Sequence, residues 1–211
     1  MPTLFILLCT SVYFFDWFGL SYIIAPTVNR EFGLLENTQL LLILCVIILA
    51  INKAKSSSLN KERLLFAGIA GFSVFVFLEE VDYFLHVIDY FKGIPETDTK
   101  VRNLHNRGNL LHFIKLTVYI SFVLILALLP LAKDFIGRRF PVLVYFIPSR
   151  WFILSLLAMA ILNQRALYVD KNMAAVSAVS LKSNISEFEE CFIYYIGFLY
   201  VRESAQKKLG L

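Results

Sequence analysis

The chain has 211 residues, of which 58% are hydrophobic and 17% are charged, with a mean hydropathy of +0.69 and a net charge of +4. A soluble globular domain carries about 25% charged residues. This composition therefore excludes a soluble globular domain and indicates a polytopic membrane protein. The basic residues gather in two loops and in the C-terminal tail, where they indicate topology, and nucleic acid is not an expected partner. The three cysteines lie in apolar segments without paired spacing, which excludes a disulfide framework and a thiolate metal motif.

The first part of the chain is predicted to contain three membrane spans. Residues 4–28 form the first span, which Asp16 interrupts, and a lone aspartate there is expected to be a hydrogen-bonded structural residue. Residues 34–51 form the second span and lead into the basic linker 52–63, which the positive-inside rule places in the cytoplasm. Residues 64–91 are predicted to form one continuous third helix whose far half is acidic.

The second part adds three further spans. Residues 109–131 form the fourth span, and 151–162 form the fifth, which begins near Pro148 after a short interfacial or re-entrant segment at 141–147. Residues 185–201 form the sixth span, followed by a basic tail. We therefore predict an all-α polytopic helix bundle of about six transmembrane helices with both termini cytoplasmic. Residues 1–211 are predicted to be a single integral domain in the cell (inner) membrane.

The acidic half of the third helix is an unusual place for charge. At a rise of about 1.5 Å per residue, Glu79 lies about 24 Å beyond Arg63, inside a hydrocarbon core about 30 Å thick. Carboxylates at that depth are costly unless they are paired, protonated, metal-bound or in a wet cavity, and they mark a functional site. The alternative is that the membrane ends early and that these residues form a solvated helix end.

The spacing within this acidic stretch predicts one polar face. In a continuous helix, Glu79, Asp82 and His86 are separated by three and four residues, which stacks them on the same side, whereas Glu80 points elsewhere. The third helix is therefore expected to present a column of acids and one histidine to its neighbours.

Other predicted spans carry polar residues at a similar depth. His105 and His112 are expected to share one face at the outer end of the fourth span, because they are seven residues apart. An outward-facing polar pocket between the helices would unite these residues with the acids of the first, second and sixth spans. Those acids are Asp16, Glu36 and Glu190.

Three chemistries suit such a pocket. Mixed carboxylate and histidine ligands, here His86, His105 and Glu190, suit a divalent metal ion that activates a water or acts as a Lewis acid. Paired carboxylates can split their pKa values and serve as acid and base. A line of intramembrane acids can also relay protons or bind cations during transport.

The leading hypothesis is a membrane-embedded enzyme that acts on a lipid-linked or amphipathic substrate from the outer leaflet. Glu79 or Glu80 would be the general base or a metal ligand, and Asn106 would orient the substrate. The first alternative is a small proton- or cation-coupled transporter, against which the apolar inner halves of the helices argue. The second alternative is an accessory subunit of a membrane complex, whose buried acids pair with a partner's basic residues.

Two short motifs carry a family resemblance. The segment Glu79-Glu80-Val81-Asp82-Tyr83 and the segment Asn103-Leu104-His105-Asn106 resemble the Glu-Glu-x-x-Trp-Gly-Gln and Asn-Leu-His-Asn motifs of a group of uncharacterised multi-pass bacterial membrane proteins. The turn at residues 30–33, followed by Glu36, is similar to a third mark of that group. The resemblance implies a helical membrane fold and candidate positions, and it implies no activity.

Overall fold

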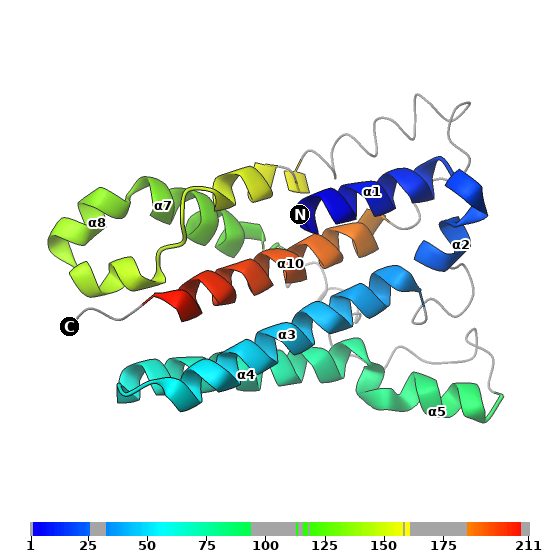
Figure 1. Cartoon of the computed structure of the whole chain (residues 1–211), viewed down its shortest axis with the longest axis horizontal. Coiled ribbons are helices and arrows are strands. Elements are labelled where there is room, and N and C mark those ends of the chain that lie inside the picture. The colour runs from blue at the N-terminus through cyan, green and yellow to red at the C-terminus, as the bar shows by residue number, and fades with distance from the viewer. Residues whose placement is uncertain are drawn as a thin grey trace. The chain divides into compact units, whose positions relative to one another are not determined.

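The computed structural model describes residues 2–25, 33–93, 113, 116–117, 119–157, 159–160 and 185–207. All regular elements in these residues are helices (Figure 1), which confirms the predicted all-α class. The chain divides into two compact units. Unit 1 comprises Met1–Leu42 and Leu154–Gly197, and unit 2 comprises Ile43–Ile153 and Phe198–Leu211. The single membrane domain predicted for the whole chain stays a prediction.

Unit 1 is built from the N-terminal helices and from parts of two long helices. It contains α1 (Pro2–Phe14), the 3-10 helix η1 (Trp17–Gly19), α2 (Ser21–Ile24), the first turns of α3 (Leu34–Ser56) and the first half of α10 (Ile185–Gln206). Its core is aromatic, because the Tyr13 and Phe188 rings pack with their centroids 5.5 Å apart. Phe192 and Tyr195 on α10 are buried in the same unit.

The predicted first span is wrong as a single helix over 4–28. The helix α1 ends at Phe14, and Asp16 adopts the left-handed conformation with φ 46°. Phe18 (φ 61°) and Gly19 (φ 66°) follow in the same region of backbone space. Asp16 Oδ1 then accepts a hydrogen bond from the Ser21 N–H at 3.0 Å, which satisfies one open donor at the start of α2. An apolar run predicts burial but not this local turn, which a short polar side chain stabilises.

Unit 2 is organised around the packing of α3 against α4 (Asn60–Glu80), which lie side by side (Figure 1). Val46 and Ala50 of α3 pack with Phe66 and Ala70 of α4 in one buried cluster, and Val201 of α10 joins it. The alanines let the helices approach closely. The second predicted span, 34–51, lies entirely within α3 and is confirmed as a helix.

The predicted third helix, 64–91, is wrong as one continuous helix. It breaks after α4 into the 3-10 helix η3 (Asp82–Phe84) and α5 (Leu85–Phe91), with a bend of 55°. The backbones of Asp82, Tyr83 and Phe84 have φ values of 44°, 53° and 63°. The helical register is lost there, so the expected column of acids on one helical face does not form.

The segment after the break ends in short helices. The helix Tyr119–Leu131 contains a π-helical turn, η5 (Val123–Leu128), and the three-residue helix α7 (Leu129–Leu131), then bends by 77° into α8 (Lys133–Arg139). The 3-10 helix η6 (Pro141–Phe146) follows, in the place predicted for a short interfacial or re-entrant segment. The start of the predicted fourth span and the end of the fifth lie outside the described residues.

One helix in the described part of the chain, α3, is long and apolar enough to cross a membrane. There are up to three such spans if each bent pair, α4 with α5 and Tyr119–Leu131 with α8, counts as one. These helices also expose large apolar side chains: Leu64 is 76% exposed and Phe72 is 69% exposed. Many exposed large apolar side chains are compatible with a surface that contacts lipid.

Candidate functional site

The break between α4 and α5 carries a buried carboxylate. Glu79, in the last turn of α4, is 5% exposed, and its Oε1 accepts a hydrogen bond from the Tyr83 hydroxyl. Because Tyr83 belongs to η3, this bond joins the end of α4 to the break itself. The Glu79 carboxylate is therefore held in one orientation by a neighbouring donor.

Further acids follow within one short segment. Asp89 of α5 is 6% exposed, whereas Glu80 and Asp82 are half-buried. We call the segment that carries Glu79, Glu80, Asp82 and Asp89 the acidic break. Burial of two of its four carboxylates argues against the alternative of a fully solvated helix end.

The backbone of the acidic break is strained. Three consecutive non-glycine residues, Asp82 to Phe84, lie in the left-handed region, where each costs about 1–2 kcal/mol. Strain of this kind persists where the surroundings enforce it, and it concentrates at functional sites. A helix break also leaves backbone carbonyl groups without their helical partners, and such groups coordinate cations in membrane proteins.

The remaining predicted acids, Asp16, Glu36 and Glu190, belong to unit 1. Asp16 has the structural hydrogen bond expected of it, at the start of α2. Glu36 lies in the first turn of α3 and Glu190 lies in α10, and the two helices are joined by a hydrogen bond from the Gln39 side chain to the Glu187 carbonyl oxygen at 3.1 Å. Within unit 1, two of the predicted acids therefore lie on packed, neighbouring helices.

The structure describes none of the predicted histidine side chains. His105, Asn106 and His112 lie outside the described residues, and the side chain of His86 is not described either. Among the residues that are described, no group of three or more His, Cys, Asp or Glu side chains could hold a metal ion. The predicted metal site, which depends on the histidines, stays a prediction.

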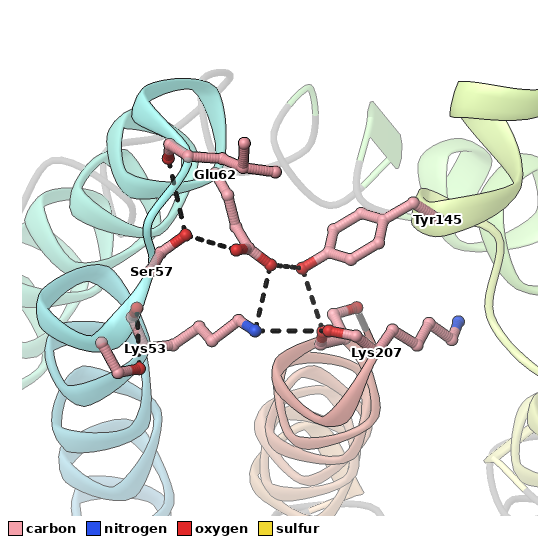
Figure 2. A network of polar contacts seen from close by, with 8 residues as sticks. Lys53, Ser57, Glu62, Tyr145 and Lys207 are labelled. Carbon is pink, nitrogen blue, oxygen red and sulfur yellow. Dashed lines mark hydrogen bonds and ion pairs between the residues drawn. The ribbon is translucent and has the colours of Figure 1, made fainter. Parts of the chain in front are cut away.

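A second polar cluster, which the sequence did not predict, lies at the other end of α4 (Figure 2). Glu62 is 6% exposed and forms an ion pair with Lys53 Nζ at 3.0 Å. Its Oε1 also accepts a hydrogen bond from the Tyr145 hydroxyl at 2.7 Å, and its Oε2 accepts one from the Ser57 hydroxyl. We call this cluster the Glu62 network; its members are Lys53, Ser57, Glu62, Tyr145 and Lys207.

The Glu62 network connects four helices of unit 2. Lys53 at the end of α3 donates to the carbonyl oxygen of Lys207, which follows α10, at 3.2 Å. The Lys207 side chain in turn donates to the carbonyl oxygen of Ile147 at 2.7 Å and pairs with Glu203 at 2.7 Å. The ends of α3, α4, η6 and α10 are thus tied together by charged groups whose polar atoms are satisfied.

Burial of the Tyr145 side chain raises the pKa of its phenol well above the ordinary value, and the hydrogen bond to the negative Glu62 raises it further. The hydroxyl therefore stays a donor to Glu62. Because the hydroxyl stays protonated and the carboxylate is already paired with Lys53, this contact stabilises the packing of the helices and supplies no reactive group. We therefore assign the Glu62 network a structural role.

One signal in the sequence pointed to this network. Glu62 is the only acid in the basic linker 52–63, and it stands in the first turn of α4, where negative charge favours a helix N-terminus. The partner Tyr145 is 83 residues away along the chain. No local pattern predicts that contact.

Comparison with protein-family models, characterised proteins and solved structures finds no match for this chain. The resemblance to multi-pass bacterial membrane proteins stays a prediction.

Proposed function

We propose that the chain is a multi-pass protein of the cell (inner) membrane with about six transmembrane helices and cytoplasmic termini. The helix α3 supports this proposal, because it is long and apolar enough to span. The packing of unit 2 supports it further. The Lys53–Lys207 contact brings the basic end of α3 together with the lysine that follows α10, as the positive-inside rule requires of two cytoplasmic ends.

Cysteine labelling tests this topology. A cysteine introduced at Ser58, in the linker between α3 and α4, should react with an impermeant maleimide only after the cytoplasmic side is opened. A cysteine at Ser177, in residues 163–184 between the fifth and sixth predicted spans, which this topology places outside, should react in intact cells. Labelling with the opposite sidedness at either position would contradict the orientation.

We propose that the acidic break is the functional site of a membrane-embedded enzyme that acts on a lipid-linked or amphipathic substrate. The observation that carries the proposal is the buried Glu79 carboxylate, oriented by Tyr83 at a strained helix break. A positioned carboxylate beside a helix end serves as a general base or acid. Glu80, the next residue, lies half-buried and is the second candidate for these roles.

The dependence on a metal ion is part of this proposal and rests on the sequence. His86, His105 and Glu190 would be the ligands, and Asn106 would orient the substrate. A bound divalent ion would supply Lewis-acid chemistry or an activated water at the outer half of the bilayer.

A second candidate is a proton- or cation-coupled carrier. Two helix breaks favour it, since Asp16 after α1 and Asp82 after α4 both stand in the left-handed conformation. Broken helices with acids at the break bind coupling ions in secondary transporters. Each aspartate is followed by an aromatic residue and a phenylalanine, so the two breaks share a local sequence as well as a conformation.

Three measurements on the same variants separate these functions. Metal content is measured on detergent-purified wild type, Glu79→Gln and His105→Ala protein, with the exposed Asp134→Ala variant as the control. The lipids of membranes that contain wild type or Glu79→Gln protein are compared by untargeted mass spectrometry. Proton uptake is followed in proteoliposomes loaded with a pH-sensitive dye.

Stoichiometric metal that is lost in Glu79→Gln and His105→Ala, together with Glu79-dependent lipid products, would support the enzyme. Glu79-dependent proton uptake without lipid products would support the carrier. Wild-type results in all three measurements for Glu79→Gln would contradict both proposals for the acidic break.

A further inference from the structure

A groove of about 550 Å³ lies between α3 and α4 near their basic ends. Its apolar floor and walls come from small and medium side chains, and two cations complete the lining. The lining residues are Ile51, Ala54, Lys55, Arg63, Ala67 and Ala70. Because α3 contributes half of them and α4 the other half, the groove is a property of how this helix pair packs.

The two cations of the groove are exposed, and the neighbouring carboxylate of Glu62 does not neutralise their charge. Lys55 and Arg63 are both exposed, and the Arg63 guanidinium donates to the carbonyl oxygen of Ser57 at 3.1 Å, which fixes its position. Glu62, next to Arg63, is buried and paired with Lys53. The negative charge of Glu62 is therefore balanced within the Glu62 network, and the groove keeps its positive charge.

The apolar part of the groove extends from these cations along the helices. Ala67 and Ala70 are four and seven residues beyond Arg63 in α4, about 6 and 10 Å along the helix axis. Their methyl groups leave a channel that longer side chains would fill. A cationic end joined to an apolar channel complements a molecule with an anionic head and a hydrocarbon chain.

We propose that this groove binds an anionic phospholipid of the cytoplasmic leaflet. The phosphate would lie between Lys55 and Arg63, and an acyl chain would lie along Ala67 and Ala70. The position supports this occupant, because Lys55 is the penultimate residue of the spanning helix α3, at headgroup level. Basic pockets between transmembrane helices at that level recognise anionic headgroups. The proposal rests on the membrane placement of α3 and is independent of the acidic break.

Native mass spectrometry of the purified protein tests this proposal, with phosphatidylglycerol and phosphatidylcholine as probes. Wild type should bind phosphatidylglycerol preferentially. Each of Lys55→Ala and Arg63→Ala should weaken that binding about fivefold, since each cation near a membrane surface contributes about that factor. Ala67→Phe, which fills the channel and keeps both charges, should weaken binding of the same lipid.

Lys61→Ala is the matched control, because Lys61 is exposed, carries the same charge and does not line the groove. It should bind phosphatidylglycerol as wild type does. Equal affinity for the two lipids, equal loss in Lys61→Ala, or full displacement of the lipid by inorganic phosphate would overturn the proposal. All variants keep Glu79, so failure here would leave the proposed enzyme site untouched.

Discussion

The two charged regions of unit 2 use carboxylates in opposite ways. In the Glu62 network the backbone is regular, and the carboxylate is matched by a lysine at 3.0 Å and by two hydroxyl donors. In the acidic break the backbone is strained at three successive residues, and four carboxylates lie within eleven residues of sequence. In the Glu62 network a buried carboxylate on regular backbone is matched by a cation and hydroxyl donors and holds helix ends together, whereas the carboxylates of the acidic break cluster on backbone whose conformation carries an energetic cost.

The largest stability effect is expected from breaking the Glu62 network. Glu62→Ala leaves Lys53 without its buried partner and should lower the free energy of unfolding by about 3 kcal/mol. Denaturant titration of the detergent-solubilised protein measures this loss.

Asp134→Ala is the control for Glu62→Ala, because it removes a carboxylate from an ion pair at a similar distance, 3.2 Å, whose two side chains are 80% and 63% exposed. It should cost less than about 1 kcal/mol. Equal losses in the two variants would show that the Glu62 network contributes no more than a surface pair.

A substitution in the acidic break is expected to reduce activity and to leave the free energy of unfolding almost unchanged. Glu79→Gln keeps the shape of the side chain and removes its charge. It should reduce the Glu79-dependent reaction by about 10²- to 10⁴-fold, as loss of a general base does. The unfolding midpoint should fall no further than in Asp134→Ala. A fully active Glu79→Gln protein would remove the acidic break from the proposed chemistry.

A smaller stability effect is expected at Tyr145. Tyr145→Phe removes the 2.7 Å hydrogen bond to Glu62 and leaves that acceptor with one donor fewer, which should cost about 1–2 kcal/mol. Tyr200→Phe is the comparison variant, since its hydroxyl donates to the uncharged carbonyl oxygen of Phe146 at 2.9 Å. A larger loss at Tyr200 than at Tyr145 would contradict the importance of the charged acceptor.

The same phenol predicts a dependence on alkaline pH. The pKa of Tyr145 is raised in the folded protein, so its stabilising contribution is fully present below the unfolded value of about 10 and declines as the pH rises above it. The difference in unfolding free energy between wild type and Tyr145→Phe should therefore shrink above about pH 10. A difference that grows with pH would have the wrong sign.

Relief of backbone strain is expected to have the smallest effect on the free energy of unfolding. The sign of that effect distinguishes a strained position from a regular helical one. Phe84 has φ 63° and is half-exposed, so Phe84→Gly should raise the unfolding free energy by about 1 kcal/mol. Ala70→Gly, at a regular helical position of α4 in the core, should instead lower it by about the same amount. Destabilisation by Phe84→Gly would show that the side chain matters more than the backbone there.

Much of the helical framework followed from residue patterns. The apolar run of α3 predicted a helix that was confirmed, and the prolines and basic residues around 138–150 predicted the short segment that is η6. The left-handed turns at Asp16 and Asp82 were not predicted, because hydropathy is averaged over many residues and such a turn depends on two or three. The acids of the break were identified, but the helical spacing that grouped them was wrong.

The sequence by itself determined that the described part of the chain is helical with apolar helices, and that its third helical segment becomes acidic, because composition and periodicity are local properties. Only the tertiary structure decided which charges are satisfied. Glu62, in a linker that looked merely basic, is paired through residues 9 and 83 positions away. A buried charge is stable only when partners reach it, and the partners are chosen by how the helices pack.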